Sequence, residues 1–125
     1  MSSRGDHQFG KEKRLLRTAQ FDQVFAGKCS SADGILVVYI APNDQLGPRI
    51  GLVVSKKVGN AVRRNRWKRR LREAFRIQQA RLPENCDLIV IPRAAIEPPL
   101  ERLCRSLVET ARRARKKLGQ RGAKQ

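Results

Sequence analysis

Apolar and polar positions alternate with a helical period over residues 61–79, the most regular stretch of the chain. Apolar side chains recur at i, i+4, i+7 and i+8, namely at Trp67, Leu71, Ala74 and Phe75. This spacing predicts an amphipathic helix with one buried face. Asn60 stands just before the pattern and is a suitable N-cap. The opposite side of the helix carries a polar row at i, i+4, i+7 and i+11: Asn65, Arg69, Arg72 and Arg76.

Three apolar runs rich in β-branched residues predict strands at residues 34–41, 49–55 and 86–91. A turn at residues 42–48 connects the first two, so we expect them to run antiparallel through this short connection. The first run is apolar on both faces, which indicates either burial on both sides or one face that serves a ligand. Residues 28–33 are predicted to form a loop.

Two further helices flank these elements. Thr18 can cap a short helix that contains Phe21, Val24 and Phe25 and ends at Gly27. The pair Pro98–Pro99 opens a last helix. Its inward positions are expected to be Leu100, Leu103, Leu107 and Ala111.

The order of elements predicts an α+β fold, an α/β sandwich with a small central mixed sheet. We write the order as α-β-β-(β)-α-β-α, with helices packed on one face of the sheet. The length of 125 residues fits a single domain. Residues 1–11 and 118–125 are polar and are expected to be disordered tails.

The charge of the chain indicates which class of partner it binds. The formal net charge is +17, and ten of the 21 residues from 56 to 76 are Lys or Arg. Like charges this dense on one helix repel one another unless a partner neutralises them, although a solvated face without a partner is the plain alternative. Nucleic acid is the leading partner class, and an anionic membrane surface is the second. The chain has no apolar run long enough to span a membrane and no apolar signal core, so we expect a cytoplasmic protein.

Aromatic residues suggest a second surface. Phe21 and Phe25 share one face of the first helix, and Ile35, Val37 and Tyr39 share one face of the first strand. If these faces meet obliquely, they form a cleft in which unpaired bases stack, although spacing alone favours ordinary core. Trp67 also could stack on a base, but its place in the apolar stripe favours core packing.

The sequence offers no persuasive catalytic or metal site. The single histidine, His7, lies in the polar N-terminal segment, and the carboxylates are scattered. The cysteines are Cys29, Cys86 and Cys104, whose spacing matches no metal-binding motif, so we expect buried thiols. The chain therefore resembles a binder of nucleic acid without chemistry of its own.

Longer motifs resemble one family. The run from Val53 to Val62, then Arg64-Asn65-Arg66-x-Lys68-Arg69, then the run from Leu71 to Arg76, is similar to the signature of the bacterial ribonuclease P protein components. Shorter motifs of that family occur in the expected order between about residues 10 and 115. Trp67 departs from the family pattern, in which an aliphatic residue is common there.

The resemblance implies a left-handed β-α-β crossover and a role in the ribonucleoprotein that removes the 5′ leader from precursor tRNA. Catalysis would reside in the RNA subunit, with magnesium held mainly by that RNA, and no protein partner would be required. The residues implied to bind the catalytic RNA are Lys56, Lys57, Arg64, Asn65, Arg66, Lys68, Arg69 and Arg72. Those implied to bind the precursor tRNA leader are Phe21, Phe25, Val37 and Tyr39.

Two rival functions follow from the residues. A generic basic RNA- or DNA-binding protein, such as a ribosomal protein, would bind without enhancing tRNA processing. A protein-only nuclease would cleave without any RNA subunit, and the lack of an acid/base pair argues against it.

Overall fold

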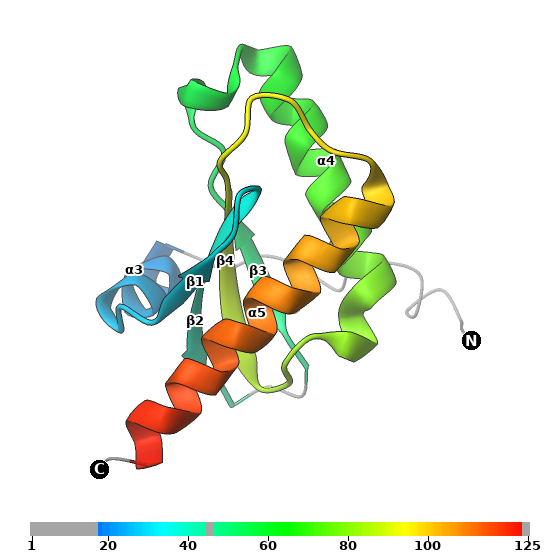
Figure 1. The fold of residues 1–125 in the computed structure, drawn as a ribbon. Helices are drawn as coiled ribbons and strands as arrows, with labels where there is room; N and C mark the ends of the chain where they lie inside the picture. Colours follow the sequence, from blue (N-terminus) through cyan, green and yellow to red (C-terminus); the bar gives the residue numbers. More distant parts are fainter. Residues whose placement is uncertain (1–17, 45–46, 124–125) are drawn as a thin grey trace, which may run out of the picture.

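The computed structural model describes residues 18–44 and 47–123, with side chains as far as residue 120. Helices and strands were predicted from sequence in nearly the places where they occur, and the mixed α+β class is confirmed (Figure 1). The elements are α3 (Thr18–Ala26), β1 (Ser30–Ala32), β2 (Leu36–Pro42), β3 (Arg49–Leu52), the 3-10 turn η1 (Lys56–Val58), α4 (Ala61–Gln78), the 3-10 turn η2 (Gln79–Arg81), β4 (Cys86–Pro92) and α5 (Leu100–Ala123).

The sheet has four strands in the order β1-β2-β4-β3. β4 pairs antiparallel with β2 and parallel with β3, and β1 pairs antiparallel with β2. α4 supplies the crossover that a parallel pair requires. The handedness of this crossover stays a prediction of the resemblance.

Two details of the predicted sheet are wrong. Residues 30–32 are not a loop but the edge strand β1. β2 and β3 do run in opposite directions, but they are not neighbours, because β4 lies between them. β4 is buried at six of its seven positions, and a strand this apolar gains most from a central place with a neighbour on each side.

The helices cover both faces of the sheet, not one as predicted. α4 and α5 pack on the face that carries Leu36, Val38 and Leu88, whereas α3 packs on the opposite face through Val24 and Ile89. Figure 1 shows α5 crossing in front of the sheet and α3 on its other side. The physical reason lies in β2 and β4, whose unbroken apolar runs present two apolar faces that both need cover.

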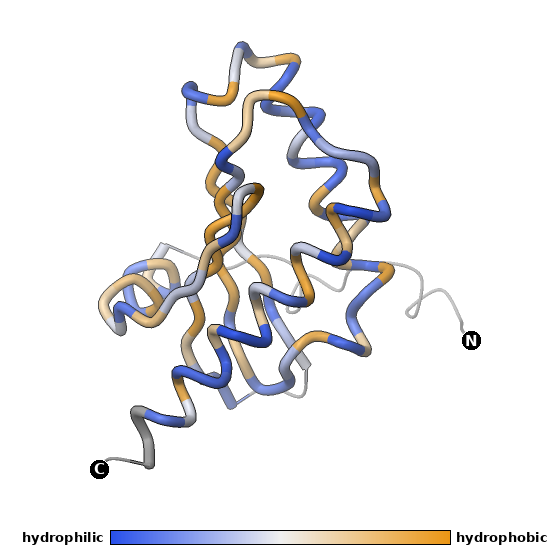
Figure 2. The backbone as a smooth tube through the Cα atoms, viewed as in Figure 1, coloured by the Kyte–Doolittle hydropathy of each residue, from blue (hydrophilic) through white to orange (hydrophobic). Residues whose placement is uncertain are grey.

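The long helix α5 carries the predicted inward stripe. Leu103, Leu107 and Ala111 are fully buried, and Leu100 is half-buried. Figure 2 shows polar and apolar residues alternating along this helix, while the strands are mainly apolar. α5 continues to Ala123, so the tail predicted from residue 118 is helical up to that point. The tail predicted at residues 1–11 lies outside the described residues.

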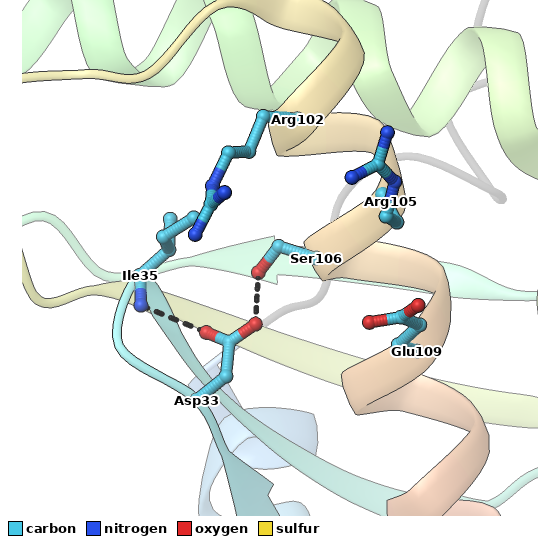
Figure 3. Close-up of a pocket in the computed structure, with 6 residues that line it drawn as sticks. All are labelled: Asp33, Ile35, Arg102, Arg105, Ser106 and Glu109. Carbon is cyan, nitrogen blue, oxygen red and sulfur yellow. Dashed lines mark hydrogen bonds between the residues drawn. The ribbon is translucent and has the colours of Figure 1, made fainter.

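Asp33 ties the turn between β1 and β2 to α5 (Figure 3). Its carboxylate accepts hydrogen bonds from the backbone N–H groups of Ile35 and Leu36, both at 2.8 Å, and from Ser106 Oγ at 2.6 Å and Thr110 Oγ1 at 3.3 Å. Burial raises the pKa of Asp33, but the four hydrogen bonds together lower it by a larger amount, so the net pKa lies below the ordinary value.

The substitution Asp33→Asn is expected to lower the free energy of unfolding at pH 7 by about 1 kcal/mol, because charge-assisted hydrogen bonds are lost. A carboxylate whose pKa is depressed by folding stabilises the fold above its unfolded pKa and loses this effect as pH falls through the folded pKa. Urea unfolding of both proteins should therefore show a constant difference from pH 7 to 5 that shrinks below about pH 4. A difference that stays the same at pH 3 would contradict the assignment.

Candidate nucleic-acid interface

A tight turn places the start of α4. Asn60 is the N-cap as predicted, since its side chain accepts a hydrogen bond from the Arg63 N–H at 3.0 Å. Gly59 has φ +136° and ψ −167°, a conformation that essentially only glycine adopts. Ser55 caps η1 in the same way, and Val58 is buried, which anchors the turn. Lys56 and Lys57 are thereby held in the exposed turn that leads into α4.

The eight residues assigned to the catalytic RNA lie on η1 and α4. Trp67, Leu71, Ala74 and Phe75 face the core as predicted, so the cationic side of the helix points outward. Six of the eight are exposed: Lys56, Lys57, Asn65, Arg66, Arg69 and Arg72. The other two, Arg64 and Lys68, are half-buried at the margin of the apolar stripe.

Not all of these charges are equally available. Arg66 Nη1 lies 3.3 Å from Glu97 Oε1, and the Glu97 side chain is only 10% exposed. Arg63 Nη1 also donates to the carbonyl of Ala95 at 3.5 Å, so the segment between β4 and α5 contacts the first half of α4. The ion pair with Glu97 was not predicted from the sequence, because Glu97 lies 31 residues from Arg66 and no local pattern connects the two.

Further along α4, Arg76 donates two hydrogen bonds to Glu73, with Nη2 at 2.7 Å from Oε2. These hydrogen bonds lower the pKa of the Glu73 carboxyl. The polar row therefore ends in an internal ion pair, whereas Arg69 and Arg72 form no salt bridge within the described part of the chain. These two guanidinium groups are the most accessible charges of the row.

Two buried N–H groups on α4 have no acceptor among the described residues: Arg64 Nε and Trp67 Nε1. Trp67 itself is completely buried, which confirms core packing over base stacking for this side chain. Each such donor costs about 1–3 kcal/mol of stability unless an acceptor reaches it. The Arg64 residue as a whole is half-buried, but its Nε atom is enclosed.

The second surface lies between α3 and the sheet. Phe25 and Tyr39 make an edge-to-face contact with ring centroids 4.9 Å apart. Phe21, Phe25 and Tyr39 are only partly buried, and all three pack against the buried pair Val24 and Ile89. The predicted aromatic set thus meets on one face, and it keeps exposed apolar surface of the kind on which bases stack. We call the surface formed by Phe21, Phe25 and Tyr39 the α3 cleft, after the cleft predicted from the sequence.

The structure also changes the membership of the α3 cleft. Val37 lies on the same strand face as Tyr39, in register with Ile91. Ile35 precedes β2 and packs against the other core cluster, so it does not belong to the cleft. Ile91 and Val53 pack against the cleft cluster and were missed. Only the alternation within the apolar runs of β3 and β4 could have indicated them.

A buried ion pair borders the same sheet face. Asp87 stands opposite Ala41 and Arg49 in the register. It accepts bonds from Arg49 Nε at 2.7 Å and Nη2 at 3.0 Å, and from Asn43 Nδ2 at 2.6 Å. This bidentate pair fastens the ends of β2, β3 and β4 to one another.

Candidate chemistry elsewhere is sparse. The three cysteines are free and buried, as predicted, and burial raises the pKa of the Cys86 thiol. Among the described residues, no three His, Cys, Asp or Glu side chains come together as metal ligands. None of the helices described is both long and apolar enough to cross a bilayer.

Comparison with known proteins shows the family to which the chain belongs. A family model described as Ribonuclease P matches residues 9–115. The chain belongs to the ribonuclease P protein family. It is 46% identical over 98 residues to the ribonuclease P protein component of Ectopseudomonas mendocina, covering 77% of this chain and 70% of that protein. The corresponding protein of Brevibacillus brevis is 39% identical over 107 residues, with coverage of 84% and 85%.

Solved structures agree with this membership in the ribonuclease P protein family. The RNase P protein of Thermotoga maritima superposes with a TM-score of 0.73 at 30% identity, covering 81% of this chain and 96% of that one. The RNase P protein of Staphylococcus aureus gives a TM-score of 0.69 at 34% identity, with coverage of 81% and 94%. The resemblance stated from the sequence motifs is therefore confirmed.

Proposed function

We propose that this chain is the protein subunit of ribonuclease P. It binds the catalytic RNA through η1 and α4 and the 5′ leader of precursor tRNA through the α3 cleft. It thereby assists endonucleolytic removal of the leader, which leaves the mature 5′ end of the tRNA. The observation that carries the proposal is the outward cationic face of α4 in a chain of this family.

The chemistry of α4 suits an RNA backbone. Guanidinium groups fork onto phosphate oxygens, and the Asn65 amide can bond phosphate or sugar. Because the row follows one side of a helix, its charges lie along a line that a sugar-phosphate chain can track.

The two surfaces lie on opposite sides of the sheet, since α3 covers one face and α4 packs on the other. One protein can therefore hold the catalytic RNA and the leader together without competition. Contacts to the leader strengthen binding of the precursor but not of mature tRNA. This difference favours substrate entry and product release.

The chain's own residues bind and orient RNA rather than carry out hydrolysis. The carboxylates of Asp33, Glu73, Asp87 and Glu97 are already engaged by hydroxyl or guanidinium groups. They form no magnesium site, so we assign the magnesium that supplies the hydrolytic chemistry to the RNA subunit. The cationic helix neutralises phosphates of that RNA, which lowers the magnesium concentration it needs. The proposal places this work in the cytoplasm and requires no protein partner.

Reconstitution tests the proposal. The purified chain is added to its cognate catalytic RNA and precursor tRNA at low magnesium, and 5′ cleavage is followed on a gel. We expect the protein to restore cleavage that the RNA alone performs poorly under these conditions. The matched control is the same protein without the RNA, which should not cleave.

Two outcomes would contradict the proposal. Binding without any gain in cleavage would indicate a generic RNA-binding protein. Cleavage by the protein alone would indicate a protein-only nuclease.

A further inference from the structure

A second cluster of arginines lies just beyond the C-terminal end of α4, where η2 passes α5. It lines a cavity of about 300 Å³. The lining residues are Ala80, Arg81, Leu82, Pro83, Arg112 and Arg115. Three of the six carry guanidinium groups and none carries a carboxylate. We call this cavity the η2–α5 groove.

A hydrogen bond between α5 and η2 holds the shape of the groove. Arg112 Nε donates to the backbone carbonyl of Arg81 at 3.2 Å, which holds that side chain against η2. Arg115 follows three residues later on the same side of α5, and all three arginines are exposed. In the described part of the chain, none of the three forms a salt bridge with a carboxylate. Three guanidinium groups around one concave surface, none of them in a salt bridge, favour the binding of an anion there.

The surrounding charges indicate which part of the groove an anion would occupy. Arg81 and Arg112 also line an adjoining cavity of about 340 Å³ together with Glu101 and Glu109, whereas Arg115 lines the groove but not that cavity. Beyond Glu109, α5 has six basic residues and no acidic one: Arg112, Arg113, Arg115, Lys116, Lys117 and Arg121. The field is therefore most positive at the end of the groove next to Arg115. This arrangement suits an extended polyanion that continues past the helix better than a small carboxylate.

The place of the groove in the fold identifies which polyanion it meets. η2 follows directly from the last residue of α4, and α5 packs beside α4 on the same face of the sheet. The α3 cleft lies on the opposite face. A nucleic acid lying along α4 can continue into the groove, whereas a leader held in the α3 cleft is separated from it by the sheet.

From these observations we infer that the η2–α5 groove binds the phosphate backbone of the same catalytic RNA that α4 contacts, as a second and separate anchoring point. The inference rests on the proposed function. Arg81, Arg112 and Arg115 are its residues, and planar guanidinium groups can grip phosphate oxygens in pairs.

The test compares two triple variants with equal loss of charge. Arg81→Gln/Arg112→Gln/Arg115→Gln removes the charges of the groove, and Lys28→Gln/Arg102→Gln/Arg105→Gln removes three exposed charges outside the groove. Affinity for the catalytic RNA alone is measured by titration over a range of salt concentrations. We expect the groove variant to bind at least tenfold more weakly with a salt slope smaller by about 2, and the control to change less than threefold.

Equal losses in the two variants would overturn the inference, because net charge alone would then explain binding. Melting temperatures check folding. If the triple variant melts early, Arg81→Gln/Arg115→Gln replaces it, with Arg102→Gln/Arg105→Gln as its control. Arg81 and Arg115 form no salt bridge within the described residues. Unchanged binding of a folded groove variant would also overturn the inference.

A further arm separates this inference from the proposed function. Variants of α4 are titrated in parallel. Normal binding by the groove variant together with weak binding by the α4 variant overturns the groove alone, whereas normal binding by both overturns the proposed function. Precursors with long and absent leaders are also bound to the assembled holoenzyme. A loss confined to long leaders would assign the groove to the precursor and overturn the inference.

Discussion

The double substitution Arg69→Ala/Arg72→Ala is expected to weaken binding of the catalytic RNA by roughly 100-fold or more at moderate salt. Both side chains are exposed, lie one helical turn apart and form no salt bridge within the described residues. A hydrogen bond to a charged group contributes about 1.5 kcal/mol or more, and 1.4 kcal/mol corresponds to a factor of ten. The slope of log affinity against log salt should fall by about 1.4 to 1.8, one phosphate for each arginine.

The fold should tolerate this change. Alanine has the highest helix propensity, and removing two like charges from a crowded face relieves repulsion. The free energy of unfolding should therefore stay the same or rise. The matched control is Arg102→Ala/Arg105→Ala, which removes the same charge from two exposed positions of α5. An unchanged salt slope in the α4 variant would show that these arginines do not touch phosphates.

The substitution Phe21→Ala is expected to weaken precursor binding by about 5- to 30-fold when the leader is long and to have little effect on a substrate without a leader. Stacking of one base on an aromatic ring is worth about 1–3 kcal/mol. Phe21 is the better choice for this test, because the ring of Phe25 also contacts Tyr39 and its loss would disturb a second side chain. The measurement is the affinity of the assembled holoenzyme for both substrates.

The control for the cleft is Ile96→Ala. Ile96 is 76% exposed and lies between β4 and α5, so its truncation removes apolar surface outside the cleft. It should leave the ratio of the two affinities unchanged. Equal losses on long-leader and leaderless substrates in Phe21→Ala would show that the aromatic set serves only as core.

Local patterns predicted much of the fold. The stripe from Trp67 to Phe75 and the cap at Asn60 both occur as expected, because a helix that buries one face must repeat its apolar residues with the helical period. The pairing of the strands could not be predicted from such local patterns. The short connection from β2 to β3 suggested neighbours, yet β4 took the central place, since pairing is decided by which strand buries most apolar surface.

For the candidate site too, some features could be predicted from the sequence and others could not. Residue types and spacing by themselves determined that one face of α4 is cationic, that Phe21 and Phe25 share a helix face, and which family the chain resembles. Tertiary structure alone decided that Glu97 pairs with Arg66 and that α3 covers the face opposite α4. It also decided that Arg81, Arg112 and Arg115 line one cavity. Periodicity acts over a few residues, whereas these contacts join segments about 30 residues apart or more. Only the packing of the sheet sets the distances between them.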